Sequence, residues 1–160
     1  MLAEPGPDGV IVRLEASAPR RWFAVATLGI LGLLLLYLAL AQPPAPGWQA
    51  FLIVLGALAL WLTQLLYRAT AQAIELRPEG LFSSDGMALA GMEEISHVDR
   101  GLFAFKPSNG FVVTLRHKQP RGWAPGLWWR FGKRLGIGGV TPSGPAKFMA
   151  EQIAFRLATR

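Results

Sequence analysis

The sequence predicts a membrane α-helical hairpin followed by a mainly β, α+β domain that a C-terminal helix closes. Two observations predict the hairpin: the runs 22–41 and 48–67 are each 20 residues long and contain no Asp, Glu, Lys or Arg. A third observation predicts the β domain and its closing helix. In residues 69–160, short segments that alternate apolar and polar residues, separated by Gly and Pro, are followed by a final stretch with helical spacing. The expected organisation is a cytoplasmic tail over 1–21, the hairpin over 22–67 and a cytoplasmic domain over 69–160.

The two apolar runs have the length of membrane spans. A hydrocarbon core about 30 Å thick needs about 20 helical residues at roughly 1.5 Å each. Neither run has the polar face of a soluble helix, so two buried helices of a soluble α domain are the less favoured alternative. The connecting segment 42–47 (QPPAPG) contains three prolines and one glycine, which cannot continue a helix and therefore predict a reversal of the chain.

Flanking charges predict the orientation of the hairpin. The connecting loop is uncharged, whereas four arginines flank the other ends of the two runs. The positive-inside rule then places both termini in the cytoplasm and the loop outside. The tail is expected to be mostly flexible, with an edge strand over 10–14 as the alternative. The four arginines are Arg13, Arg20, Arg21 and Arg68.

The first part of the domain has the pattern of β-hairpins. Residues 74–77 alternate apolar and polar side chains, a turn follows at 78–80, and strand character resumes at 81–82. The pair Asp85-Gly86 is a strong hairpin signal, because both central residues of a type I′ turn need a positive φ. Residues 87–90 are the expected return strand.

Further strands are expected along the rest of the domain. Ile95 and Val98 are the expected inward anchors of the segment 92–100, and strands at 101–106 and 111–117 are expected to form an antiparallel pair. The aromatic, basic and Gly-rich stretch 123–140 predicts two short strands around a loop, with its glycines in tight turns or at close backbone approaches.

A helix is expected to close the domain. It should begin near 143–145 with Ser143 as the N-cap. Phe148 and Phe155 form a second apolar stripe, which a loop, lipid or a partner must cover, so these residues mark a possible partner face. The expected core stripe consists of Ala146, Met149, Ala150, Ile153 and Leu157.

Three motifs carry a family resemblance. The segments 76–81 (LRPEGL), 85–86 (DG) and 93–100 (EEISHVDR), followed by more strands and an amphipathic helix, resemble bacterial PH-like domains that follow one or two membrane helices. The resemblance covers about residues 72–158. It implies a bent antiparallel β-sandwich of about seven strands plugged by the C-terminal helix, in a protein of the bacterial inner (cytoplasmic) membrane. The basic first loop of lipid-binding PH domains corresponds here to 77–80, with one arginine and one glutamate, and no functional residue is carried over.

The residues that support catalysis or metal binding are scarce. The chain has no cysteine, which excludes disulfides, thiolate metal sites and cysteine nucleophiles. Its two histidines, His97 and His117, lie in separate segments, and His97 with Asp99 is more typical of a surface pair than of an acid–base site. The Gly-rich stretch fits neither a P-loop nor a dinucleotide fingerprint. We therefore expect no enzyme activity, catalytic residue, metal, cofactor or small-molecule substrate.

Charge is distributed unequally within the domain. Residues 69–100 contain two basic and six acidic side chains, whereas residues 101–160 contain ten basic and one acidic. Docking on an anionic leaflet is the favoured interpretation, because Lys, Arg and Trp all favour the headgroup layer. A solvated face is the main alternative, and nucleic acid is not expected because the domain is tethered to a membrane. The candidate contacts with lipid or a partner are Arg121, Trp123, Trp128, Trp129, Arg130, Lys133 and Arg134.

Two functions follow as expectations. The first is a membrane-anchored binding module that presents its basic, Trp-rich domain at the cytoplasmic leaflet, to anionic lipid or an acidic protein. The alternative is an accessory or assembly subunit of a larger membrane complex. Small residues that permit close helix contacts favour this alternative: Gly29, Gly32, Gly56, Ala57 and Ala59.

Overall fold

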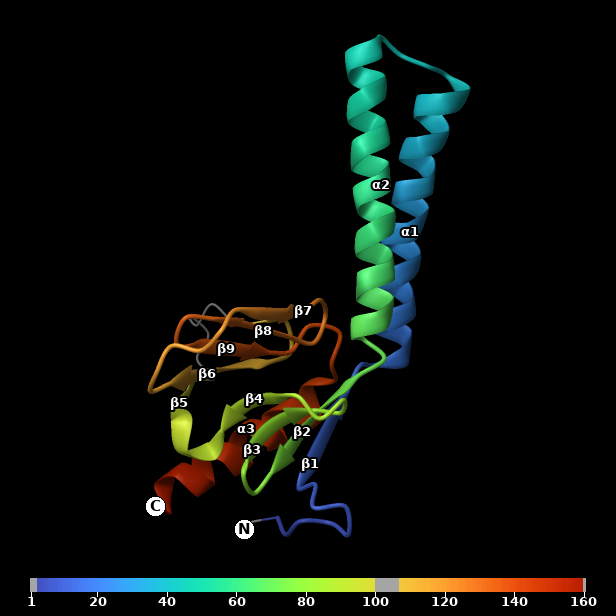
Figure 1. The fold of residues 1–160 in the computed structure, drawn as a ribbon. Coiled ribbons are helices and arrows are strands. Elements are labelled where there is room, and N and C mark those ends of the chain that lie inside the picture. Colours follow the sequence, from blue (N-terminus) through green and yellow to red (C-terminus); the bar gives the residue numbers. More distant parts are fainter. Residues whose placement is uncertain (1–2, 100–106, 160) are drawn as a thin grey trace. The chain divides into compact units, whose positions relative to one another are not determined.

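The computed structural model describes residues 3–99 and 107–159 (Figure 1). The chain divides into two compact units. Residues 18–68 form the helical unit, and the segments on both sides of them together form the β unit. The β unit is therefore built from two stretches of chain that the helical unit separates.

The helical unit is an antiparallel pair of helices, α1 (Ala18–Ala41) and α2 (Pro46–Ala69). By length and composition, both helices are long and apolar enough to cross a membrane. The predicted reversal is confirmed but shorter than expected, because α2 begins at Pro46, where a missing N–H costs a helix nothing. At the loop end the amide Nε2 of Gln49 donates to the carbonyl oxygen of Ala39, 3.0 Å away.

Two glycines allow the helices to touch at mid-length. A Cβ built on Gly32 would lie 3.1 Å from the carbonyl oxygen of Gly56, and one built on Gly56 would lie 3.1 Å from that of Gly32. The same two positions would also meet the side chains of Leu60 and Leu36 at 2.9 Å. Gly32 and Gly56 thus serve packing within the hairpin itself.

The β unit contains two antiparallel sheets and a helix, seen together in Figure 1. The first sheet has the order β1-β2-β3-β4 and the second has the order β5-β6-β9-β8-β7. The first comprises β1 (Val12–Glu15), β2 (Ala73–Arg77), β3 (Gly80–Ser83) and β4 (Ala88–Gly91). The second comprises β5 (Ile95–Asp99), β6 (Phe111–Leu115), β7 (Gly122–Ala124), β8 (Trp128–Phe131) and β9 (Arg134–Ile137), with a 3₁₀ turn (Met92–Glu94) before β5.

The edge strand is present in place of a wholly flexible tail. In β1, Leu14 pairs with Ile74 and Glu15 pairs with Ala73 of β2. Val12 and Leu14 are buried, whereas Arg13 and Glu15, which alternate with them, are exposed. This alternation adds two apolar side chains to the core, which explains why the N-terminal segment joins the β unit.

Helix α3 (Ser143–Ala158) packs against β1 and β5 and buries the predicted stripe, with Leu157 partly buried at its end. The expected N-cap is wrong: Ser143 is the first helical residue and Pro142 occupies the cap position without a side-chain bond. A capping hydroxyl needs an N–H two or three residues later; Pro145 has none, and that of Ala146 donates to the carbonyl oxygen of Pro142.

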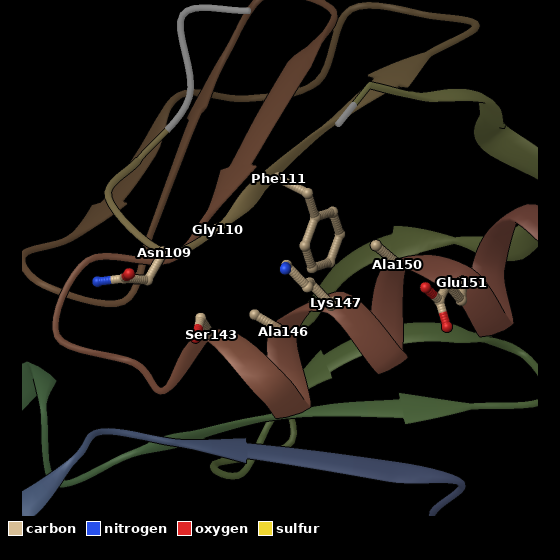
Figure 2. Close-up of a pocket in the computed structure, with 8 residues that line it drawn as sticks. All are labelled: Asn109, Gly110, Phe111, Ser143, Ala146, Lys147, Ala150 and Glu151. Atoms are coloured by element: carbon tan, nitrogen blue, oxygen red, sulfur yellow. The ribbon is translucent and has the colours of Figure 1, made fainter. Parts of the chain in front are cut away.

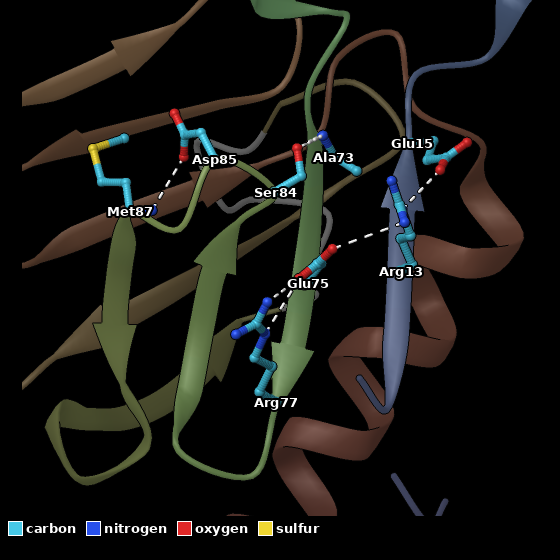
Figure 3. A network of polar contacts seen from close by, with 8 residues as sticks. All are labelled: Arg13, Glu15, Ala73, Glu75, Arg77, Ser84, Asp85 and Met87. Carbon is cyan, nitrogen blue, oxygen red and sulfur yellow. Dashed lines mark hydrogen bonds and ion pairs between the residues drawn. The ribbon is translucent and has the colours of Figure 1, made fainter. Parts of the chain in front are cut away.

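Other expectations differ in detail. Ile95 and Val98 are buried as predicted, but the stretch 123–140 holds three strands instead of two. The hairpin between β3 and β4 is confirmed with a different turn, because Gly86 has a φ of 87° whereas Asp85 does not have a positive φ. Instead, Oδ1 of Asp85 accepts a bond from the amide of Met87 at 3.1 Å (Figure 3).

The strand expected at 101–106, and its pairing with 111–117, lies outside the described residues. The described residues form nine strands, against about seven implied by the PH-like resemblance. Two antiparallel sheets with a C-terminal helix agree with the mainly β, α+β class. The PH-like fold itself stays a prediction.

Candidate binding face on the second sheet

Strand register places several candidate residues on one face of the second sheet. Trp123 pairs with Trp129, Trp129 pairs with Gly136, and Phe131 pairs with Arg134. Because paired residues of neighbouring strands point to the same side, these side chains share the face opposite to the core. Arg121 lies two residues before Trp123, and its guanidinium carbon is 4.6 Å from the centroid of the Phe131 ring. We call this set the aromatic face: Arg121, Trp123, Trp129, Phe131 and Arg134.

Gly136 makes room for one of these rings. A Cβ at this position would lie 2.2 Å from Cε2 and 2.4 Å from Nε1 of Trp129. The indole therefore lies directly over the glycine, with part of its surface covered by the sheet backbone. The predicted close backbone approach occurs at another glycine of the stretch, Gly139, where a Cβ would lie 2.7 Å from the carbonyl oxygen of Gly126.

The aromatic face is hollowed between its rings. A shallow pocket of about 430 Å³ is lined by Gly122, by Arg130 and by four residues of the face. A second hollow of about 290 Å³ shares Trp123 and Trp129 as walls and extends to Gly138. Trp123 and Phe131 are 57% and 60% exposed, and they are the two large apolar side chains of the described β unit that are more than half exposed.

Lys133 lies at the tip of the β8–β9 turn. Gly132 precedes it with a φ of 60°, in the first central position of a two-residue turn, where glycine is favoured. Lys133 and Arg134 are both exposed. The turn therefore adds one cation, Lys133, next to Arg134 of the aromatic face.

Two predicted contacts have structural roles instead. Trp128 is 4% exposed and belongs to the core cluster. Arg130 donates from Nε to the carbonyl oxygen of Pro120 at 2.7 Å and from Nη1 to that of Leu89 at 2.6 Å. Since Leu89 is in β4, Arg130 bridges the two sheets. The sequence missed this because alternation along β8 turns 128 and 130 inward and 129 and 131 outward, and the register was unknown.

The second apolar stripe lies on a different element. Phe148 and Phe155 of α3 are 45% and 42% exposed. Both rings therefore keep much of their surface exposed, and no loop within residues 3–99 and 107–159 covers them fully. This possible partner face is separate from the aromatic face.

A larger pocket lies between the start of β6 and α3 (Figure 2). It measures about 620 Å³, and its lining includes Phe111 from the sheet and Lys147 and Glu151 from the helix. Sequence reasoning missed it because residues far apart in the chain form it. Its lining also includes Ser143, and Lys147 and Glu151 place one cation and one anion on adjacent helical turns.

A buried carboxylate in the first sheet is neutralised by arginine (Figure 3). Glu75 is 6% exposed, and its Oε2 accepts bonds from Nη2 and Nε of Arg77 at 2.7 and 3.2 Å. Arg13 approaches the other carboxylate oxygen at 4.0 Å. A buried charge held in this way is a structural ion pair. Arg77 is the one arginine of the loop that corresponds to the lipid-binding loop of PH domains, and this ion pair already holds its guanidinium group.

The histidines lie apart from these features. His97 is exposed on β5, with Asp99 two residues further along the strand, and His117 is exposed beyond the end of β6. Among residues 3–99 and 107–159, no group of three or more His, Asp or Glu side chains could hold a metal ion.

Comparison with known proteins adds no relative. No family model matches the chain, and neither the curated proteins nor the solved structures contain a significant match. The resemblance to bacterial PH-like domain proteins therefore rests on the sequence motifs alone.

Proposed function

We propose that the protein is a membrane-anchored, non-enzymatic binding module whose PH-like domain presents the aromatic face to anionic lipid or to an acidic protein. The aromatic face supports this proposal most directly. Two guanidinium groups and three aromatic rings share one side of a sheet, and two of the rings are more than half exposed. Such exposed aromatic groups beside cations are typical of contact surfaces.

Short connections support a role at the membrane surface. Two residues separate β1 from α1, and three separate α2 from β2. Chain segments of this length reach at most about 10 to 14 Å. Surface potentials of anionic leaflets act over about 10 Å, and each Lys or Arg within that range contributes about 1 kcal/mol. The cations of the domain would then set its orientation at the leaflet.

The orientation of the hairpin is part of the proposal. Arg20 and Arg21 lie in the first turn of α1, and Arg68 lies in the last turn of α2, whereas the loop between the helices is uncharged. Nη2 of Arg21 donates to the carbonyl oxygen of Tyr67 at 3.2 Å, so the cationic ends lie together. We infer that both termini are cytoplasmic and that the membrane is the bacterial inner membrane.

Photo-crosslinking in cells tests the binding role. A benzophenone amino acid in place of Trp123 reports on the aromatic face, and the same group in place of the exposed Glu79 is the control on the first sheet. We expect crosslinks to lipid or to a protein from position 123 and few from position 79. Equal and negligible crosslinking from both positions would contradict the proposal.

The alternative is an accessory or assembly subunit of a membrane complex. The exposure of Phe148 and Phe155 favours it, since a partner could bury both rings. The small residues of the helices favour it less, because Gly32 and Gly56 already pack against one another. Purification of the full chain in mild detergent tests it: a companion lost in a Phe148→Ser/Phe155→Ser variant supports the alternative, and a lone monomer contradicts it.

A further inference from the structure

We propose that the aromatic face inserts into the headgroup layer of an anionic leaflet, with Trp123 and Phe131 as the inserted side chains and Arg121, Lys133 and Arg134 as phosphate contacts. This inference rests on the proposed function and narrows its ligand to phospholipid. The partner is defined by its chemistry: a layer with an apolar interior beneath negatively charged phosphates.

The exposure of the two rings is the first support. Trp123 lies on β7, which ends the order of the second sheet, and Phe131 lies at the end of β8 beside the Gly132 turn. Both rings are more than half exposed, while the hollow between them is lined mainly by aromatic and aliphatic atoms. Side chains of this kind at an edge and a turn can enter a headgroup layer without any change in the core, because Trp favours that depth.

The arrangement of cations around the rings is the second support. The Arg121 guanidinium stacks on the Phe131 ring, Arg134 pairs with Phe131 across the strands, and Lys133 occupies the turn. Guanidinium groups bind phosphate oxygens through paired hydrogen bonds, and an ammonium binds them as a point charge. Phosphates surrounding an inserted ring would meet these cations at the same depth.

The placement of acidic residues on this face is the third support. One row of paired residues crosses the second sheet from β7 to β5. It consists of Trp123, Trp129, Gly136, Val112 and Asp99. Four strand spacings separate Asp99 from Trp123, or about 19 Å. Among the described residues, those that line the hollow include no acid. Anionic phosphates would therefore meet cations around the inserted rings, with the carboxylate of Asp99 at the opposite edge of the sheet.

An acidic protein is the competing ligand, and the hairpin favours lipid over it. A chain anchored by two membrane-spanning helices with connections of two and three residues always has a leaflet within reach, without any second component. A tethered contact of this kind forms at a high effective concentration. Even weak insertion would then be populated.

Hydrogen exchange of the full chain in nanodiscs tests the inference. The discs contain either phosphatidylcholine alone or phosphatidylcholine mixed with phosphatidylglycerol, and exchange is followed by mass spectrometry. We expect amides within residues 121–134 to exchange more slowly in the anionic discs, and high salt to abolish the difference. Peptides from the first sheet, which lies apart from the aromatic face, should exchange equally in both lipids.

Matched variants separate insertion from general attraction. Trp123→Ser/Phe131→Ser should lose the protection, whereas Phe148→Ser on α3 should retain it. Exchange in β6 reports whether each variant is folded, and the salt titration of the wild type does not depend on any variant. Equal exchange of residues 121–134 in the two lipids, or full protection in the folded double variant, would overturn the inference.

The outcomes also distinguish this inference from the function on which it rests. Equal exchange in the two lipids, together with crosslinks from position 123 to an acidic protein, overturns lipid insertion and leaves the binding module in place. Equal exchange with no crosslinks from position 123 overturns both. Protection in anionic discs together with lipid crosslinks supports both.

Discussion

Arg130 and its neighbours on β8 divide between the core and the surface. Trp129 and Phe131 point outward, while Trp128 is buried and Arg130 donates to carbonyl oxygens of Pro120 and Leu89. Its guanidinium carbon also lies 5.9 Å from the centroid of the Trp128 ring. A cation that looks like a ligand contact in the sequence is therefore a link between the two sheets.

Replacing this cation should affect stability more than binding. In Arg130→Lys, one ammonium group cannot satisfy two carbonyl oxygens placed for a planar fork, so we expect a loss of about 2 kcal/mol in the free energy of unfolding. Arg134→Lys, at an exposed site, should change it by less than about 0.5 kcal/mol. Thermal unfolding of the full chain in mild detergent, followed by near-ultraviolet circular dichroism, measures both. Equal unfolding of the two variants would contradict the role of Arg130.

Gly136 allows a second test at this scale. In Gly136→Ala the new methyl group would occupy the space of the Trp129 ring, and moving the ring or straining the sheet should cost about 1–2 kcal/mol. Gly144→Ala is the matched control, because no atom of the described residues lies within 4 Å of its Cβ and alanine favours a helix. The same unfolding measurement compares them. Wild-type stability of Gly136→Ala would show that the ring does not depend on the glycine.

At the scale of elements, β1 shows that the N-terminal segment is part of the core. Leu14 has no exposed surface and pairs with β2, while the backbone amide of Ser17 donates to the carbonyl oxygen of Val140 at 2.8 Å. Nearer the N-terminus, the backbone amide of Ala3 donates a hydrogen bond to the side-chain oxygen of Gln152 on α3, 2.9 Å away. These contacts attach the start of the chain to its end.

Truncating Leu14 should therefore destabilise the β unit strongly. We expect Leu14→Ala to lower the free energy of unfolding by about 2–4 kcal/mol, from lost apolar burial and the cavity left behind. Arg13→Ala, at the exposed neighbouring position, should cost less than about 1 kcal/mol, because its pair with Glu15 lies at the surface and Glu75 keeps its two hydrogen bonds from Arg77. A flexible tail would instead make both substitutions neutral in urea unfolding of the full chain.

The elements differ in how far the sequence could predict them. The helices and the stripe of α3 repeat their signal over many residues, and both were predicted. β1 has four residues, and its partner in β2 lies beyond the whole hairpin, so alternation could suggest a strand without choosing between strand and tail. The outward direction of Trp129 and the inward direction of Trp128 depend on register, which adjacent tryptophans in a short strand do not reveal.

At the scale of the whole molecule, the helical unit is an insertion between two paired strands. β1 leads into α1, α2 leads into β2, and Glu15 at the end of β1 pairs with Ala73 at the start of β2. In chain order, the two antiparallel helices therefore lie between the two strands of an antiparallel pair. The β unit is therefore tied to the hairpin by two connections, as the edge-strand alternative implies, and not by one connection beside a mostly flexible tail.

The most direct test is whether the full chain has the proposed topology in the bacterial inner membrane. Because the chain has no cysteine, one introduced thiol reports a single site. With a membrane-impermeant maleimide applied from outside, Ala45→Cys in the loop should be labelled in spheroplasts, and Glu79→Cys in the β unit only after lysis. Labelling of Glu79→Cys in intact spheroplasts, or protection of Ala45→Cys until lysis, would contradict a membrane hairpin that holds its binding face in the cytoplasm.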